Sequence, residues 1–401
     1  MMGTGKPKVK ILLLSGILLL LCIIRISLLP VAAPAGEHQT QQPGHYDYEG
    51  DVHFHTKYEK PGDEAYEKIA AITNQQHVDF MISTDRNNLN AFFDHKEGWY
   101  GNTLFLVGAE ISRPEGYLLG LNLHEYPITR EWPTDKVLAE IVRQNGIALV
   151  AHPSSPRWRW QMQDDPRTAG QEILNLTDQF NSASPDAMLI SALYYPFNTP
   201  AAFMELYHYP AEALKIWDEK TAKHPFTGVF APDFHPDFHQ RLFPLKKDIF
   251  ISFPNAEDMI PVGHNHIILQ NPFAHTLQDK KMIYDAIRQG HLYVAMDMLQ
   301  DATGFFFSAK QGGKTVWMGD TLPAARETEF SVSLPPTVSL KNIMIHVYQN
   351  GKEISQSRES PYKFKAKTPG AYRVEVEAEI PTFWGFGREV TWIYSNPIYL
   401  R

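Results

Sequence analysis

Two histidines one residue apart, His53 and His55, stand in the run Gly-Asp-Val-His-Phe-His-Thr. Side chains at positions i and i+2 of a β-strand point to the same face, so both imidazoles can reach one cation while Val52 and Phe54 pack behind them. The pair predicts half of a metal site. Because the chain holds 17 histidines, such a pair can also arise by chance, and the prediction needs partners elsewhere.

Further residues of ligand type follow apolar runs. They are Asp85 after 80–84, Glu110 after 104–109, His152 after 147–151, and the spaced pair Asp233 and His235 after 228–232. Any one of them could be an ordinary cap or turn residue. Burying several together at one end of a sheet is costly unless a cation offsets the charge, so the set as a whole favours a metal site.

The elements that must position these residues alternate along the chain. Short apolar segments predict strands at 51–55, 80–83, 104–111 and 147–151, with helices at 64–76 and 135–145. This order predicts parallel strands covered by helices, as an α/β barrel or an open α/β sheet, in which sites collect at the C-terminal ends of strands.

After about residue 300 the pattern changes to alternating β-favouring segments separated by turns such as Asn350-Gly351. They predict strands at 305–308, 328–334, 342–349, 362–366, 371–379 and 390–394. We expect a small antiparallel β-sandwich over 301–401, following a metal-binding domain over 48–300.

The N-terminus reads as a targeting segment. Three lysines precede an apolar run over 11–24, which Arg25 interrupts and 26–35 continues. Residues 1–36 are therefore expected to be a signal peptide or a signal anchor, with 37–47 as a linker. Ala33-Pro34-Ala35 resembles a cleavage site, yet the span suffices for an uncleaved anchor. Either way the rest is expected outside the cytoplasm, periplasmic or at the cell surface, with membrane contact through this segment only.

Composition narrows the chemistry. A net charge of −8 argues against nucleic acid as the primary partner. The single cysteine, Cys22, lies in the N-terminal apolar segment, so the remainder of the chain has neither a disulfide nor a thiolate ligand. Metal must be held by His, Asp and Glu, which suits zinc, manganese or iron.

The ordered set resembles the PHP family, the polymerase and histidinol phosphatase metallohydrolases. The resemblance covers about 50–300 and rests on His-Phe-His at 53–55, Thr-Asp-Arg-Asn at 84–87, Gly-Ala-Glu at 108–110, Ala-His-Pro at 151–153 and Asp-Phe-His at 233–235. Segments 286–295, 304–308 and 395–399 are similar to the carbaryl-hydrolase-like branch, whose members carry a β-sandwich after the catalytic domain.

The resemblance implies a distorted (β/α) barrel of PHP type with up to three divalent ions. By position, the first ion would be held by His53, His55, Glu110 and Asp233. Glu110 would bridge to a second ion held also by His152, and Asp85 joins the expected ligands. For a further histidine of the family pattern the candidate is His124, although Tyr117 can occupy the matching position.

Arg86 departs from the family, which has histidine there. A guanidinium stays protonated and cannot ligate a metal, so the third site is missing or rebuilt, and we expect one or two ions. Arg86 could instead bind a substrate phosphate or carboxylate through two N–H donors. Arg86 and His235 are the expected catalytic residues.

For other histidines and for two tryptophan–arginine pairs, the sequence gives less support for a functional role. His239, His264, His266 and His275 lack matched carboxylates in the sequence and are expected to line the cleft mouth or to pack locally. Trp158 and Trp160, with Arg157 and Arg159, could form a substrate wall for an organic anion or an ordinary surface loop.

The leading hypothesis is an exported metal-dependent hydrolase that uses a metal-bound hydroxide on a phosphoester or on a carbamate or carboxylic ester. Its substrate would be a small-molecule or lipid-like ester. Arg86 motivates an alternative, an exported binding protein of the same fold that has lost turnover. A β-domain adhesin with an inert barrel ranks third.

Overall fold

A computed structural model of the chain describes residues 20–27, 29, 44–59, 65–127, 131–162, 164–234, 239–241, 250–252, 254–382 and 386–401. Most of the N-terminal apolar segment and of the expected linker lies outside these residues. Among the described residues, no helix is long and apolar enough to cross a membrane. Export and membrane anchoring stay predictions.

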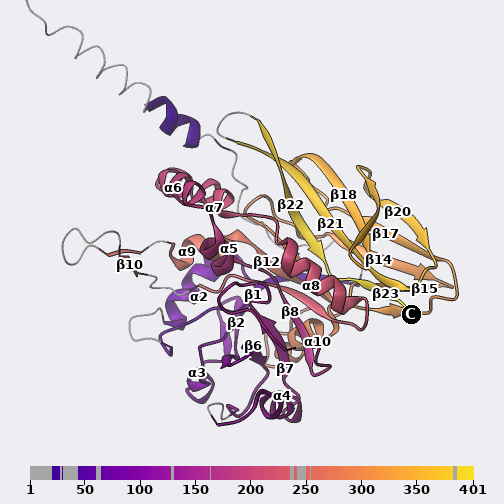
Figure 1. Ribbon diagram of the computed structural model, residues 1–401, viewed down its shortest axis with the longest axis horizontal. Coiled ribbons are helices and arrows are strands. Elements are labelled where there is room, and N and C mark those ends of the chain that lie inside the picture. The colour runs from indigo at the N-terminus through magenta and orange to yellow at the C-terminus, as the bar shows by residue number, and fades with distance from the viewer. Residues whose placement is uncertain are drawn as a thin grey trace, which may run out of the picture.

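The first part of the chain forms half of a large sheet with strands in the order β3, β4, β2, β1, β12 and β13. These strands are β1 (Tyr46–Val52), β2 (Phe80–Ser83), β3 (Gly98–Tyr100), β4 (Thr103–Val107), β12 (His264–Leu269) and β13 (Leu292–Ala295). Of these, β2, β1 and β12 are labelled next to one another near the middle of Figure 1. β1, β2 and β4 pair in parallel. β12 runs antiparallel to both β1 and β13.

A second sheet contains five strands in sequence order. They are β5 (Ala109–Arg113), β6 (Gly116–Leu121), β7 (Ile147–Ala151), β8 (Thr168–Asn175) and β9 (Thr227–Ala231). β5, β6 and β7 are antiparallel, and β7, β8 and β9 are parallel. The α/β class is confirmed, but the sheets are mixed where a parallel barrel was expected, because the tight turn between Arg113 and Gly116 sends the chain straight back.

The predicted strand at 104–111 is divided at Gly108. The Gly108 N–H donates to the Ser83 carbonyl at 2.7 Å, so it still follows β4 beside β2. A Cβ at this position would meet the Gly120 carbonyl oxygen at 2.8 Å. The absence of a side chain lets the chain pass closely from one sheet to the other and brings Glu110 onto β5.

Helices complete this part of the molecule. They are α2 (Tyr66–Gln75), α3 (Asn90–Phe93), α4 (Thr134–Arg143), α5 (Leu176–Ser182), α6 (Pro185–Tyr194), α7 (Thr199–Leu206), α8 (Ala211–Thr221), α9 (Ala256–Met259) and α10 (Asp279–Gln289), with a 3₁₀ turn at Ile260–Val262 and the short strands β10 (His239–Arg241) and β11 (Phe250–Ser252). α4 shows the usual reason for helix docking: Val137, Leu138 and Ile141 form one buried apolar stripe.

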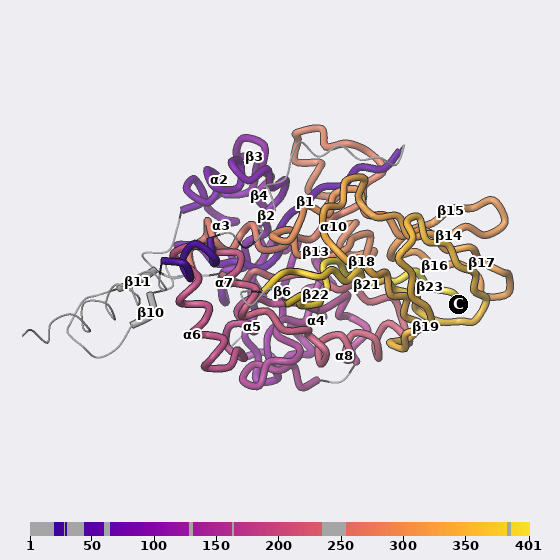
Figure 2. Tube along the Cα trace, turned by 90° about the horizontal axis from the view of Figure 1, so that it is seen from above, coloured from indigo at the N-terminus to yellow at the C-terminus, as the bar shows by residue number. Residues whose placement is uncertain are grey.

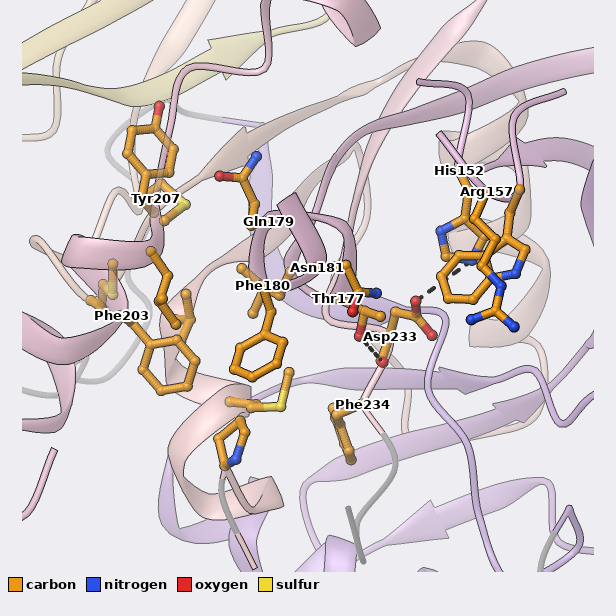
Figure 3. Close-up of a pocket in the computed structure, with 18 of the residues that line it drawn as sticks. His152, Arg157, Thr177, Gln179, Phe180, Asn181, Phe203, Tyr207, Asp233 and Phe234 are labelled. Atoms are coloured by element: carbon orange, nitrogen blue, oxygen red, sulfur yellow. Dashed lines mark hydrogen bonds and ion pairs between the residues drawn. The ribbon is translucent and has the colours of Figure 1, made fainter. Parts of the chain in front are cut away.

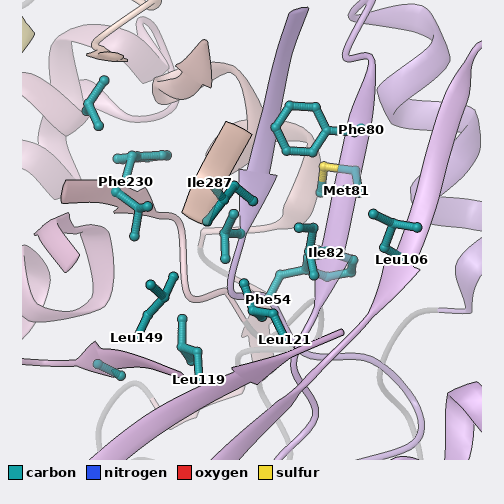
Figure 4. Packing of buried hydrophobic residues seen from close by; sticks show 14 of the residues in the cluster. Phe54, Phe80, Met81, Ile82, Leu106, Leu119, Leu121, Leu149, Phe230 and Ile287 are labelled. Carbon is teal, nitrogen blue, oxygen red and sulfur yellow. The ribbon is translucent and has the colours of Figure 1, made fainter. Parts of the chain in front are cut away.

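The main hydrophobic core draws on strands of both sheets (Figure 4). Phe80 and Ile82 come from β2, Leu106 comes from β4, and Leu119 and Leu149 come from β6 and β7. This packed interior fixes the strand ends that carry the polar residues described below.

The C-terminal part contains two further strand groups. β14 (Phe306–Gln311), β15 (Lys314–Trp317), β17 (Thr328–Ser333) and β20 (Tyr362–Ala366) form a four-stranded sheet. β16 (Thr321–Leu322), β18 (Lys341–Gln349), β19 (Lys352–Ser357), β21 (Gly370–Pro381), β22 (Gly387–Ser395) and β23 (Ile398–Leu400) belong to the large sheet. Both groups contribute to a second buried cluster that includes Phe330, Val347 and Trp392.

The two parts of the chain share a sheet. β22 pairs antiparallel with β13, and it lies beside β13 near the middle of the molecule (Figure 2). The large sheet is therefore continuous from β3 to the C-terminal strands. A closed distorted barrel followed by a β-sandwich stays a prediction.

Candidate metal centre

The histidine pair sits just past the end of β1. The strand ends at Val52, and His53 has a positive φ of 80°, so the expectation that both histidines lie on the strand is wrong. Backbone hydrogen bonds replace the ladder: His53 N donates to Ile82 O at 3.2 Å, and His55 N donates to Phe234 O at 3.1 Å. Val52 and Phe54 are fully buried, as expected.

Two carboxylates, those of Asp233 and Glu110, come from the second sheet. Backbone hydrogen bonds hold both residues to the first sheet. Asp233 N donates to His53 O at 2.8 Å, and Glu110 N donates to Thr84 O at 3.1 Å. Asp233 and His152 also have positive φ values, 47° and 51°. Such backbone conformations are costly for non-glycine residues and collect at functional sites. The two sheets are thus joined where the polar side chains meet.

Three imidazole nitrogens converge on two carboxylates. The Nε2 atoms of His53 and His55 each lie 3.2 Å from Asp233 Oδ1 and 3.9 Å from a Glu110 oxygen. His152 Nε2 lies 3.5 Å from Glu110 Oε1 and 3.6 Å from Asp233 Oδ2. All five side chains are almost completely buried. The structure therefore brings together five of the predicted ligands.

Each histidine has a carboxylate behind it. The Nδ1 atoms of His53, His55 and His152 lie 2.5 Å from Glu172, 2.6 Å from Glu59 and 3.1 Å from Asp178. Metal-binding histidines usually donate their second ring N–H to such a carboxylate, which fixes the tautomer and turns the other nitrogen toward the metal. The same arrangement occurs here three times.

Sequence reasoning missed these three outer carboxylates. Glu172 carried one available signal, because it is a charged residue in the middle of the buried strand β8. Asp178 gave no distinctive signal, because an acidic residue in the first turn of a helix is common. Its N–H donates to Asn175 Oδ1 at 2.9 Å, as in a helix cap. Glu59 lies in a turn that bears no strand or helix pattern.

The donor set fits a divalent metal ion. Tetrahedral zinc with bonds of 2.0 to 2.1 Å places its ligand atoms about 3.3 Å apart, close to the separations found here. Among the described residues, His53 Nε2 is buried without a hydrogen-bond partner. Atoms of this kind are costly to bury unless a further group satisfies them. His53, His55, His152, Glu110 and Asp233 would hold the metal.

The charges of the cluster are strongly coupled. Burial alone would lower the pKa of His55, but its hydrogen bonds with Asp233 and Glu59 raise it to about 10. Burial alone would raise the pKa of Glu110, but its hydrogen bond with His152 and the nearby charged groups lower it to about 2. These shifts favour a protonated His55 beside an ionised Glu110. Binding a metal ion through His55 would displace its proton.

Arg86 is part of the centre. Its Nε donates to Glu110 Oε2 at 2.7 Å, its Nη1 lies 3.5 Å from Glu59, and the guanidinium carbon lies 5.6 Å from the Tyr117 ring centroid. Its side chain remains 33% exposed, which leaves part of the guanidinium accessible. Arg86 thus supplies a permanent positive charge beside the ligands.

Asp85 takes a more local role. Its two oxygens accept hydrogen bonds from Thr56 N at 2.6 Å and Thr56 Oγ1 at 2.7 Å. It also groups with His55 and Glu59 as a second possible set of ligands. The structure places Asp85 beside the centre, holding the loop that carries His55.

A cavity of about 310 Å³ opens from one edge of the centre (Figure 3). Its polar end is lined by Arg86, His152, Arg157 and Asp233. Its other lining residues are mostly apolar and include Phe180, Phe203, Leu206, Met259, Val262 and Met298. The centre therefore faces a chamber that suits an apolar group with a polar end.

The remaining predicted residues fall in different places. His124 is exposed, and its ring lies 6.2 Å from Phe92, so it is not brought to the centre; it follows β6 on an exposed turn. Tyr117 instead lies beside the centre, with its ring centroid 5.9 Å from that of His152. Trp158 lines the cavity, whereas Trp160 is buried in the core. His235 lies outside the described residues.

Comparisons with known proteins give distant structural matches only. No family model and no curated protein matches the chain. A two-domain protein from Bacteroides vulgatus ATCC 8482, described as containing a predicted PHP-like metal-dependent phosphoesterase, is similar over 90% of this chain and 99% of its own, at 12% identity and a TM-score of 0.40. A protein from Bifidobacterium adolescentis ATCC 15703, described as a metal-dependent phosphoesterase, is similar over 46% of this chain and 87% of its own, at 11% identity and a TM-score of 0.29. The candidate centre is therefore argued from its own geometry.

Proposed function

We propose that the chain is a metal-dependent hydrolase of esters that carry an apolar group. The observation that supports this is the convergence of three imidazole Nε2 atoms and two carboxylates at the polar end of the cavity. A divalent ion bound there would lower the pKa of a water molecule and stabilise negative charge that develops on the substrate.

The side chains of this chain provide the remaining steps. Arg86 and Arg157 line the polar end, where their N–H donors can bind the oxygens of the ester and of its transition state. Glu172, Glu59 and Asp178 keep the three imidazoles oriented. Because the centre itself is buried, the reacting group would enter from the cavity side.

The apolar part of the cavity points to the other half of the substrate. Phe203, Leu206 and Met259 would contact an aryl or alkyl group and exclude water from it. We therefore propose a phosphoester, carbamate or carboxylic ester with such a group. We also propose that the protein acts outside the cytoplasm, on the basis of the N-terminal sequence pattern.

The test uses the full chain loaded with Zn²⁺ or Mn²⁺ and assayed on p-nitrophenyl phosphate, bis-p-nitrophenyl phosphate and 1-naphthyl acetate. We expect metal-dependent hydrolysis of at least one, with the bulkier aryl esters preferred. A suitable control is Asp285→Asn, which removes an exposed carboxylate paired with Lys281. Bound metal with no hydrolysis on any of the three would contradict the proposal.

One observation favours a binding protein instead. Glu110 would have to hold metal while its Oε2 accepts a hydrogen bond from Arg86 at 2.7 Å. If this ion pair persists in the loaded protein, the centre can bind an anionic ligand without turning it over. Arg86→His would separate the two functions, because a gain of hydrolysis without a gain of ligand affinity identifies Arg86 as the block.

A further inference from the structure

A second cluster of histidines and carboxylates, none of which lines the cavity, lies on β1, β12 and the segment after β13. It consists of Asp47, Glu49, Asp51, His264, His266 and Asp297. Glu49 pairs with His266 across β1 and β12, and Gly50 pairs with Asn265, so Asp51 stands next to His264. Alternate residues of a strand share a face, which places the three β1 carboxylates on one side of the sheet.

The separations resemble those of the first centre, although His264 presents Nδ1 where His53 and His55 present Nε2. Asp297 Oδ2 lies 3.0 Å from His264 Nδ1 and 3.1 Å from His266 Nε2. Glu49 Oε2 lies 3.8 Å from the first nitrogen and 3.9 Å from the second. At the first centre the corresponding separations are 3.2 and 3.2 Å to Asp233, and 3.9 and 3.9 Å to Glu110. Glu49, His264 and Asp297 can place one ligand atom each around a single ion, and His266 Nε2 faces the same two carboxylates.

The cluster also has outer support. His266 Nδ1 lies 3.1 Å from Asp47 Oδ1, the arrangement that turns the Nε2 atom of a histidine toward a metal. The His266 ring stacks on Tyr293, with centroids 4.6 Å apart. Asp47 in turn accepts a hydrogen bond from the Gly304 N–H at 2.8 Å. These contacts hold the imidazole in a single orientation.

Unsatisfied groups remain inside the cluster. Asp51 is 0% exposed, and within the described part of the chain neither of its carboxylate oxygens has a hydrogen-bond partner. His264 Nε2 is likewise buried without a partner among those residues. A fully buried, unbonded carboxylate is costly, and a cation beside it would offset that cost. Asp51 is therefore a second observation, independent of the four-atom geometry.

We propose that this cluster is a second metal site, which binds a divalent transition-metal ion through His264, His266, Glu49 and Asp297, with Asp51 beside it. The absence of thiolates and the two-imidazole, two-carboxylate set suit zinc, the probe used below. None of the six side chains lines the cavity, whereas His152 and Asp233 of the first centre do, so an ion bound here would be structural. It would tie β1 and β12 to the segment that leads into the C-terminal strands, where the Ala302 N–H donates to Asp297 Oδ1 at 3.0 Å.

The experiment measures zinc per chain by mass spectrometry of metals in the full-length protein, after loading and removal of loose metal. Asp233→Asn impairs the first centre and is expected to leave about one zinc ion, at the position that anomalous scattering at the zinc edge would locate between β1 and β12. Asp297→Asn is expected to remove that ion and to leave the first centre loaded. A folded Asp233→Asn protein with no zinc anomalous signal at the second cluster would overturn the proposal.

Asp51→Asn gives a test that does not require Asp297→Asn to fold. If zinc is bound, losing this carboxylate lowers both the zinc content and the melting temperature. If the cluster is held only by protonated imidazoles, removing a buried unbonded charge raises the melting temperature and changes no metal content. The sign of the shift therefore decides between the two states, and a rise would contradict the proposal.

Discussion

The two His-x-His clusters have the same ligand types and nearly the same separations, but their surroundings differ. His53 and His55 meet Asp233 at the edge of a cavity, with a partly exposed arginine beside them. His264 and His266 meet Asp297 beside the segment that leads into the C-terminal strands, and none of these three residues lines the cavity. Open metal sites serve catalysis and closed ones serve structure. What distinguishes the two clusters is contact with the cavity rather than ligand chemistry.

The largest effect should come from Asp233→Asn. This change removes the oxygen that faces both His53 and His55. Loss of an outer carboxylate alone typically costs about 10- to 100-fold in metal affinity or activity, so loss of a shared ligand should exceed about 100-fold. Steady-state hydrolysis measures it, with Asp285→Asn as control. Unchanged activity would show that the first cluster is not the catalytic one.

Asp297→Asn should act on stability instead. It takes a carboxylate from two buried imidazoles, and breaking a buried pair costs about 3 to 5 kcal/mol. Denaturant unfolding measures the free energy of unfolding, and ester hydrolysis by the protein that remains folded should be close to that of the wild type. If hydrolysis fell while stability did not, the assignment of open and closed roles would be reversed.

Glu172→Gln should give an intermediate effect. The Glu172 carboxylate lies 2.5 Å from His53 Nδ1 and also accepts the His152 N–H at 2.8 Å. An amide keeps the shape but weakens the support of the imidazole, so metal affinity should fall about 10- to 100-fold. Titration with zinc under a competing chelator measures it. An unchanged affinity would mean that the carboxylates behind the histidines do not tune the first centre.

The smallest effect concerns His346, whose two ring nitrogens lie 3.1 Å from Glu353 and 3.2 Å from Glu377 without a second imidazole. Its pKa is raised to about 9, first by the hydrogen bond with Glu377 and further by Glu353. A raised pKa stabilises the fold fully below about pH 6.5, and this contribution is lost as pH rises to about 9.

For a pair this close to the surface we expect at most about 1 kcal/mol. Comparing His346→Asn with wild type at pH 6 and pH 9.5 measures it, and the difference between the two proteins should shrink at the higher pH. Zinc bound at His346 would show that one imidazole between two carboxylates is enough to bind the metal. The ligand similarity of the two His-x-His clusters would then say less about their function.

Several local features were predictable from the sequence because they depend on short-range patterns. The strand at 80–83 and the strand at 147–151 match β2 and β7, and the apolar runs correctly placed Glu110, His152 and Asp233 near one another. The resemblance to the PHP family remains a prediction. His124 was misplaced because spacing alone does not show where the loop after β6 directs its side chains.

Long-range pairings could not be read in the same way. Asp297 meets His264 only because β13 pairs with β12, and Glu49 meets His266 only through the pairing of β1 with β12. Both Asp297 and Glu49 are too far from His264 and His266 in the sequence to form a short motif with them. Glu172 at the first centre was missed for the same reason, since it reaches His53 from another sheet.

The pairing of β1 with β12 also has a consequence for how the chain matures. Tyr46 on β1 pairs with Leu269 on β12, so β1 cannot complete its pairing until β12 has been synthesised. Contacts so distant in sequence slow folding, and an unpaired strand edge is prone to associate with other chains in the meantime. Ligands on β1 meet those on β12 only once that edge closes. The metal content of a newly synthesised chain would therefore show whether β1 has paired with β12.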